Sequence, residues 1–212
     1  KSGGACGEVM GLNKYKLFDN YSDIFSQAFE NEQEHIFSIQ FNADYTDFSA
    51  RMLWYLGPSK EEWDKFNGLG GSSAPTSFYN KYDEWDLRLE HNLAKTWRGQ
   101  PFKDSRIAVI KYWDRTGKQM LDHDGLNFPV FRYADVLLMY AEVLNENGKP
   151  GLALPYLNDV RERARKTNPI DPRRDQQAYI PATTTNTLPD ITETDQERLK
   201  EIIWKERRCE LA

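Results

Sequence analysis

The chain has 212 residues, of which 39% are hydrophobic, 13% aromatic and 29% charged, and its formal net charge is -5 at pH 7. The acidic balance argues against a protein that binds the phosphate backbone of nucleic acids. The two cysteines, Cys6 and Cys209, are too few for a disulfide framework, although one pair stays possible. No apolar run approaches membrane-spanning length, and the size fits one domain.

The N-terminal part of the chain predicts few regular elements. Residues 1–11 are glycine-rich and are expected to be irregular. Residues 19–32 carry apolar side chains on one side and predict a short helix. Alternation through residues 34–41 predicts a strand, with His35 exposed at its end.

The middle of the chain is rich in loops. Residues 42–77 are expected to be mostly loop, with a short helix over 59–66 capped by Ser59. Residues 78–89 then predict a helix, and 106–113 a strand. A further loop leads up to residue 127.

The clearest pattern is a helical hairpin over residues 128–165. Residues 132–147 favour a helix that is apolar nearly all round, and Gly148 followed by Lys149 and Pro150 is a stop signal. A second helix starts at Pro150. The spacing fits a tetratricopeptide-type unit whose interface consists of Ala141, Ala153, Leu157 and Val160. Because such repeats need about three units for stability, we expect the chain to be part of a longer protein.

The C-terminal part is a long polar loop, residues 166–194, followed by a final helix. A capping box from Thr194 to Glu197 starts that helix. Its inner face is expected to contain Leu199, Ile202, Ile203, Cys209 and Glu206. If Glu206 points inward, it needs a buried cationic partner.

These segments together resemble one known family. The runs FPVFRYADVLLMYAEVLNENG, ALPYLNDVRERA and IIWKERRCELA, with EHIFSIQF, APTSFYNKYDEWDLR and IKYW before them, resemble the SusD/RagB family of outer-membrane nutrient-binding lipoproteins. The resemblance implies one region over residues 1–212, with the tetratricopeptide-like hairpin at 128–166 inside it. The implied fold is mainly α, with long loops and a few short strands.

The resemblance also implies a function. Such a protein is a lipid-anchored, surface-exposed subunit that captures oligo- or polysaccharide. Its partner is a SusC-like TonB-dependent transporter, and it uses no cofactor. Five charged residues match the family signature and are expected to be ion-paired scaffold rather than site: Arg132, Asp135, Arg161, Glu206 and Arg207.

The candidate ligand-binding residues follow from the chemistry of sugar recognition. Sugars offer an apolar C–H face and a rim of hydroxyls, so proteins bind them with exposed aromatic rings and polar neighbours. The candidates are Trp54, Tyr55, Trp63 and Trp97, with Arg51, Asp64, Asn67 and Arg98 as polar neighbours. Each tryptophan is equally compatible with the edge of a core. Trp85, Trp113 and Trp204 lie in periodic segments and are expected to be core.

Two other functions stay open. A glycoside hydrolase needs two carboxylates about 5–10 Å apart, and the 33 acidic residues offer too many pairs to identify one. A tetratricopeptide-type adaptor would bind peptides. The chain predicts no catalytic residue and no metal site, because Asp122-His123-Asp124 is best interpreted as a solvated turn and His91 and His123 as isolated surface residues.

Overall fold

The computed structural model describes residues 2–42, 55–57, 59, 70, 73–97, 100–113, 125–168 and 187–211. Its helices are α1 (Ser2–Gly11), α3 (Thr76–Tyr79), α4 (Arg88–Asn92), α5 (Tyr133–Glu146), α6 (Pro150–Lys166) and α7 (Gln196–Leu211), with short 3₁₀ helices η1 (Tyr21–Phe25), η2 (Gln27–Phe29) and η4 (Lys103–Ser105). Its strands are β1 (His35–Ile39), β2 (Leu93–Ala94), β3 (Thr96–Trp97), β4 (Gln100–Pro101), β5 (Ala108–Val109) and β6 (Phe128–Arg132). Within these residues no helix combines the length and the apolar character needed to cross a membrane.

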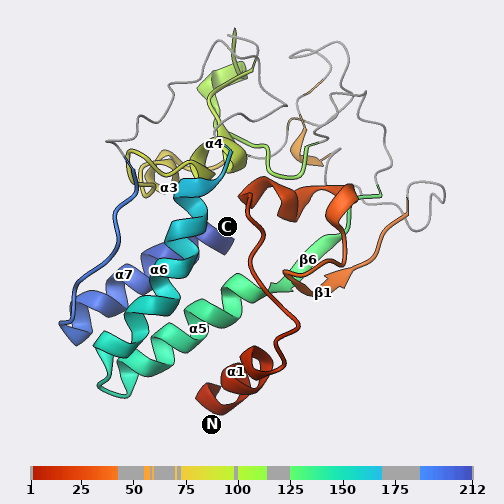
Figure 1. Cartoon of the computed structure of the whole chain (residues 1–212). Helices are drawn as coiled ribbons and strands as arrows, with labels where there is room; N and C mark the ends of the chain where they lie inside the picture. The colour runs from red at the N-terminus through yellow and green to blue at the C-terminus, as the bar shows by residue number, and fades with distance from the viewer. Residues whose placement is uncertain are drawn as a thin grey trace.

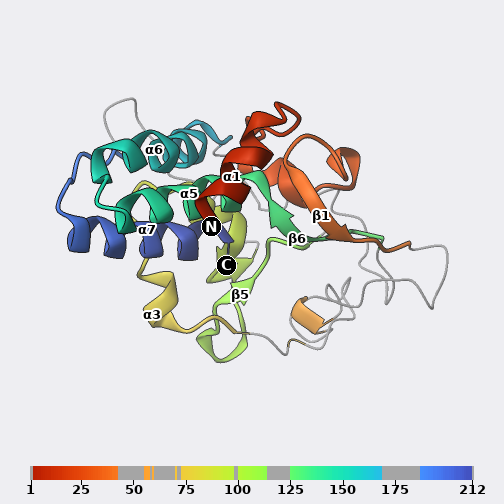
Figure 2. The ribbon, with the colours of Figure 1, turned by 90° about the horizontal axis from the view of Figure 1, so that it is seen from below.

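The helices form one layer around α5, which packs against α1, α6 and α7 (Figures 1 and 2). Their shared core, the helical core, consists of Ala134, Leu137, Leu138, Ala141, Ala153, Leu157, Val160, Leu199 and Ile203. Since α5 is covered on several sides, its nearly continuous apolar surface is explained.

The predicted hairpin is confirmed. Ala141 and Ala153 are fully buried between α5 and α6, and Leu157 and Val160 lie beside them with 0% exposure. Gly148 ends α5 with φ +69, and its amide bonds to the carbonyl of Asn145 at 2.9 Å. A residue without Cβ is favoured there because this left-handed conformation crowds any other side chain.

The N-terminal segment differs from its prediction, because residues 2–11 are helical. A helix with four glycines is unfavourable by intrinsic propensity, so its packing on α5 must supply the stability. Gly3 allows that packing, since a Cβ at this position would lie 2.8 Å from Cγ1 of Val143. Cys6 is buried, and the structure records both cysteines as free thiols.

A second core lies beside the strands. The aromatic core consists of Phe18, Tyr21, Ile24, Phe25, Ala94, Phe102, Ala108, Ile110, Tyr112, Trp113 and Leu126. The strand predicted over 34–41 is confirmed as β1, which pairs antiparallel with β6 in a two-stranded sheet. The register shifts between His35 and Ser38, which is a local bulge. The pairs β2–β5 and β3–β4 are shorter.

Three sequence predictions in this half were too long. The helix over 19–32 is broken into η1 and η2, since Ser26 between them is extended. The helix over 78–89 is replaced by the single turn of α3 and by α4, and the strand over 106–113 is limited to Ala108–Val109. Near α4 the Asp86 carboxylate accepts a bond from the backbone amide of Arg88 at 3.1 Å, a local turn that competes with continuous helix.

The final helix α7 is confirmed, but its cap is one residue later than predicted. The Asp195 carboxylate, not the Thr194 hydroxyl, accepts a bond from the amide of Arg198 at 3.0 Å. Leu199, Ile203, Glu206 and Cys209 face inward as expected, while Ile202 is half-buried.

Candidate functional site

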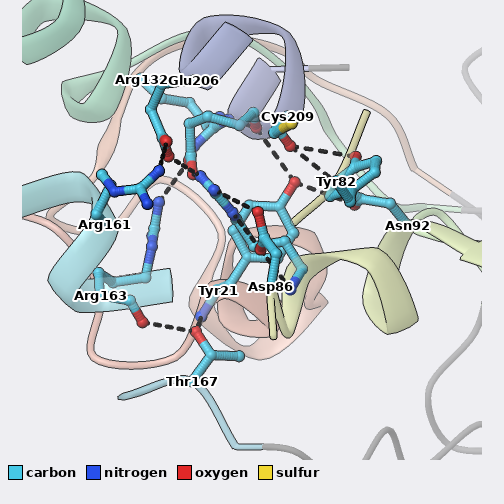
Figure 3. A network of polar contacts seen from close by, with 12 residues as sticks. Tyr21, Tyr82, Asp86, Asn92, Arg132, Arg161, Arg163, Thr167, Glu206 and Cys209 are labelled. Atoms are coloured by element: carbon cyan, nitrogen blue, oxygen red, sulfur yellow. Dashed lines mark hydrogen bonds and ion pairs between the residues drawn. The ribbon is translucent and has the colours of Figure 1, made fainter. Parts of the chain in front are cut away.

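A buried ionic network, part of which is drawn in Figure 3, joins the helices to the strands. It contains four arginines and four carboxylates, all at most 5% exposed: Arg88, Arg132, Arg161, Arg163, Glu34, Asp86, Glu206 and Glu210. Burying a charge is costly unless an opposite charge and hydrogen bonds compensate. Here the numbers of positive and negative groups are equal.

Glu210, near the end of α7, is the centre of this network. Its carboxylate lies 2.8 Å from Arg132 Nη1 and 3.0 Å from Arg88 Nη1, and it also pairs with Arg163. Burial opposes ionisation, but the surrounding guanidinium groups overcome that effect and lower the pKa of Glu210 to about 2. The side chain is therefore a permanent anion at neutral pH.

Glu34 extends the network to the sheet. Its Oε1 lies 2.9 Å from Arg132 Nη1 and its Oε2 lies 3.0 Å from Arg163 Nη1. Oε2 also accepts a bond from the amide of Phe18 at 2.7 Å. Since Glu34 precedes β1 and Arg132 ends β6, this ion pair fixes the base of both strands.

A layer of neutral groups covers the other side of the network (Figure 3). Tyr21 Oη lies 3.0 Å from Asn92 Oδ1, and Asn92 Nδ2 donates to Tyr82 Oη at 2.9 Å. Burial raises the pKa of both tyrosines above their ordinary value. Tyr21 and Tyr82 also donate to the backbone carbonyls of Glu210 and Cys209, so these enclosed groups are held by several hydrogen bonds. The network is therefore a structural frame.

The expected ion pairing of the signature residues is confirmed. Arg161 Nη1 pairs with Glu206 Oε2 at 2.7 Å, which supplies the cationic partner that an inward Glu206 requires. Arg207 Nη2 pairs with Asp135 Oδ1 at 2.8 Å. Arg132 pairs with two glutamates as described above.

A hollow of about 440 Å³ lies beside β1. Aromatic, amide and charged side chains line it together: Lys14, Tyr15, Asn31, Glu32, Gln33, His35, Ile36, Phe37 and Ser38. Lys14 Nζ lies 5.4 Å from the centroid of the Tyr15 ring, a cation–π contact. The Phe37 ring is 55% exposed at this site.

Reciprocal amide bonds fix one wall of the hollow. Asn31 Nδ2 donates to Gln40 Oε1 at 2.9 Å, and Gln40 Nε2 donates to Asn31 Oδ1 at 3.0 Å. Asn127 Nδ2 donates to the same Gln40 oxygen at 2.8 Å. On the other side Gln33 Nε2 donates to the carbonyl of Leu17 at 3.2 Å. Two of the lining side chains, Asn31 and Gln33, are therefore held by hydrogen bonds within the protein.

Exposed apolar side chains lie on both strands of the sheet beside the hollow. Phe37 on β1 is paired in register with Phe131 on β6, which is 49% exposed. Ile39 and Val130 are exposed on the same two strands. Exposed rings next to amides and charges are suited to a ligand with a flat C–H surface and a hydroxyl rim.

Sequence reasoning missed the hollow. Its residues come from the segment before η1, from the turn after η2 and from β1, so no short motif contains them. The available signal was β1 itself, where the large apolar residues Phe37 and Ile39 alternate with the polar residues Ser38 and Gln40.

The candidate site residues are only partly described. Tyr55 is 56% exposed. Trp97 belongs to β3 and pairs in register with Gln100. Trp54 and Trp63 lie outside the described residues. So do their proposed polar neighbours Arg51, Asp64, Asn67 and Arg98.

Some single-residue predictions need correction. Trp113 is core, at 1% exposure, and Trp85 is half-buried, but Trp204 is 48% exposed. His35 and His91 are buried rather than exposed. The two histidines are buried by contacts with distant backbone carbonyls, whereas Trp204 is exposed because it lies on the outer side of α7.

Each histidine contacts a distant backbone carbonyl. His35 Nε2 lies 3.0 Å from the oxygen of Ile24, and His91 Nε2 lies 2.9 Å from that of Asn168. Burial lowers the pKa of His35. His123 and the acidic pair beside it lie outside the described residues, and among those that are described no group of three or more His, Cys, Asp or Glu could hold a metal ion.

Comparisons with known proteins agree with this fold. The model of the SusD family matches residues 3–212. SusD-like protein P25 of Formosa agariphila is 27% identical, over 98% of this chain and 42% of its own length.

Solved structures agree as well. A SusD-like carbohydrate binding protein from Bacteroides fragilis superposes with TM-score 0.76 at 21% identity, over 99% of this chain and 45% of its own. Surface glycan-binding protein A from Bacteroides uniformis gives 0.70 at 20% identity, over 98% and 41%. The expected mainly helical, SusD-like fold is confirmed, and the chain spans less than half the length of these relatives.

Proposed function

The chain belongs to the SusD family, and on this premise we propose that it is part of a non-catalytic, surface glycan-binding subunit of an outer-membrane uptake system. In this proposal the protein is lipid-anchored and passes oligo- or polysaccharide to a SusC-like TonB-dependent transporter. The names of two solved neighbours, a carbohydrate binding protein and a surface glycan-binding protein, support the ligand class.

The observation that carries the proposal is the hollow beside β1. It combines the exposed ring of Phe37 and the Tyr15 ring with amides that are fixed in place. Stacking of a ring on a sugar face and hydrogen bonds from planar amides to hydroxyls are complementary contributions. A peptide groove or a phosphate site would require different chemistry.

The loop aromatics remain part of the proposed binding surface. Trp54, Tyr55, Trp63 and Trp97 would stack on sugar units, and the exposure of Tyr55 supports its membership. Polysaccharide chains present several rings in series, so several separated aromatic contacts suit them better than one closed pocket does.

A glycoside hydrolase is the less supported alternative. It requires a pair of accessible carboxylates, whereas the carboxylates of the ionic network are each held by arginine and buried. A peptide-binding adaptor would use the tetratricopeptide-type groove, yet the described hollow lies on the strands instead.

Isothermal titration calorimetry against a panel of plant, algal and host oligosaccharides tests the proposal. We expect binding without products in the calorimeter cell after incubation. Glycan fragments released from the ligand would support the hydrolase, and binding of peptides but no glycan would support the adaptor.

Combined Trp54→Ala and Trp63→Ala substitution should weaken binding, with exposed Leu152→Ala as the matched control. Unchanged affinity of the double variant would remove these loop residues from the site.

The transporter partner and the anchor need separate tests. Cross-linking in intact cells of the native bacterium, followed by purification of this protein, should recover a TonB-dependent transporter. Fractionation should find the protein in the outer membrane. Recovery only from the cytoplasmic fraction would contradict both parts of the proposal.

A further inference from the structure

Trp204 is a large aromatic side chain on the outer side of α7, where an amphipathic helix normally carries polar residues. Its side chain is 48% exposed. The indole Nε1 nevertheless donates a hydrogen bond to Glu142 Oε1 on α5 at 2.8 Å. The ring is therefore held in one orientation although it is open to solvent.

Lys200 supports the ring from the same helix. Its Nζ lies 5.3 Å from the centroid of the Trp204 ring, and it is held 2.9 Å from Glu146 Oε1. The hydrogen bond and the charge of Glu146 raise the pKa of Lys200 above its ordinary value, so the ammonium stays charged beside the ring. Glu142 and Lys200 thus contact the exposed ring, and Glu146 holds Lys200 in place.

The surroundings distinguish this feature from an apolar docking face. The other large hydrophobic side chains with comparable exposure, among the residues that the structure describes, lie outside α5 and α7: Leu12, Phe29, Phe37, Ile39, Tyr55, Val130, Phe131 and Leu152. A protein interface needs a contiguous apolar core of several residues. A single ring with carboxylates and an ammonium beside it fits a sugar instead.

We propose that Trp204, with Glu142, Glu146 and Lys200, forms a second sugar-stacking platform on the helical side of the protein. Its ligand class is a neutral pyranose unit of a polysaccharide, whose hydroxyls can both donate to carboxylates and accept from an ammonium. This inference rests on the proposed glycan-binding function, and it assigns an additional site that is separate from the hollow beside β1.

The two proposed sites lie on different parts of the protein, so a long glycan could contact both. Figures 1 and 2 show β1 beyond one end of α5, whereas α7 runs alongside α5. One long glycan chain that reaches both sites would bind more tightly than either site alone, because the second contact becomes intramolecular. A monosaccharide gains nothing from the second site.

Fluorine NMR of protein labelled with 5-fluorotryptophan tests the platform directly. The resonance of Trp204 is assigned by its loss in Trp204→Phe. The probes are soluble polysaccharides with glucan, xylan, mannan and galactan backbones. We expect one of them to shift this resonance, and to do so also in a variant with Trp54→Ala, Trp63→Ala and Phe37→Ala, in which the first site is weakened.

Two further variants measure the contribution of the Trp204 platform to polysaccharide binding. Trp204→Ala should weaken binding of that polysaccharide roughly three- to tenfold, and Glu142→Ala, which frees the ring without removing it, should cause a smaller loss. Circular dichroism checks that both variants fold. A polysaccharide that binds by calorimetry but leaves the Trp204 resonance unmoved would overturn the platform and leave the proposed function intact. Failure of the unmodified protein to bind any probe would contradict both.

Discussion

The Arg132 guanidinium lies 2.8 Å from the Glu210 carboxylate, although 78 residues separate them in the chain. Arg132 ends β6 and precedes α5, while Glu210 lies near the end of α7. Arg132 Nη2 also donates to the backbone oxygen of Glu210 at 2.7 Å. The pair therefore ties the sheet that carries the hollow to the helical layer.

Removing the charge of Glu210 is expected to be strongly destabilising. Glu210→Gln keeps the side-chain shape but leaves Arg132 and Arg163 with one carboxylate, Glu34, between them. Breaking a buried ion pair from one side costs about 3–5 kcal/mol, so urea denaturation at pH 7 should show a loss of that size. Glu162→Gln, in an exposed pair with Lys166 on α6, is the control and should leave the free energy of unfolding nearly unchanged. Equal effects of the two substitutions would contradict the central role of Glu210.

The same carboxylate predicts a specific acid sensitivity. Its pKa falls from an ordinary value of 4.5 to about 2 in the folded protein. Because the folded pKa is the lower one, the stability from Glu210 is fully present above the unfolded pKa and is lost as the pH falls through the folded pKa. The loss is on the order of 3 kcal/mol. Unfolding free energies measured across this window should fall more steeply for the unmodified protein than for Glu210→Gln. Parallel curves would refute the assignment.

Some members of the ionic network could be predicted from the sequence and others could not. Glu206 sits on the apolar face of a periodic helix, so its need for a cation is predictable from local pattern. Glu34 is different, since its partner Arg163 is 129 residues away. No local period links two such residues, and only the folded chain brings them together.

The helices show the same division. The hairpin was predictable because its periodicity and its glycine stop are both local. Helix α1 was not, because its formation depends on the close approach of Gly3 to Val143. Trp204 was misplaced because it is adjacent to the buried Ile203, and neighbouring residues on a helix point about 100° apart. The hollow, assembled from three separate segments, was beyond any local pattern.

Lys111 adds a second pH dependence of the same sign, in a window at higher pH. It is 7% exposed, and its ammonium lies 4.8 Å from the Tyr112 ring and 5.3 Å from the Phe25 ring. Burial, assisted by the positive charge of Arg132 and opposed by Glu210, lowers its pKa to about 7 from an ordinary 10.5. In this window the unfolded chain binds the proton more tightly, so stability should rise with pH above 7 by up to roughly 1 kcal/mol per pH unit.

Substitution isolates the effect of Lys111. Lys111→Met removes the buried charge and is expected to add about 1–3 kcal/mol at pH 7 and to flatten the dependence. Urea unfolding between pH 7 and about pH 9.5, below the ordinary range of tyrosine ionisation, measures both. The exposed Lys16→Met serves as control. A destabilised Lys111→Met protein with an unchanged slope would show that this charge does not oppose folding.

Two glycines at the hairpin should respond in opposite directions to the same change. Gly148 has φ +69, so Gly148→Ala forces a side chain into the left-handed region and should cost about 1–2 kcal/mol. Gly151 lies in α6 with no atom within 4 Å of an added Cβ. Gly151→Ala should therefore gain about 0.5–1 kcal/mol from helix propensity. Thermal and urea unfolding of both variants provide the comparison, and a shared sign would exclude the conformational explanation.

Phe37 allows the hollow to be tested without disturbing the frame. Its ring is 55% exposed and lies at the rim, so Phe37→Ala removes stacking surface while the ionic network below stays intact. For a glycan identified by calorimetry, we expect the affinity to fall roughly tenfold, with little change in the free energy of unfolding. Leu12→Ala is the matched control, because Leu12 is 65% exposed and does not line the hollow.

If both substitutions leave the affinity unchanged while the loop tryptophan variants lower it, the ligand binds at the loops and not at β1. If Phe37→Ala alone lowers it, the hollow belongs to the binding surface, and the register pairing of Phe37 with Phe131 makes Phe131→Ala the next residue to measure.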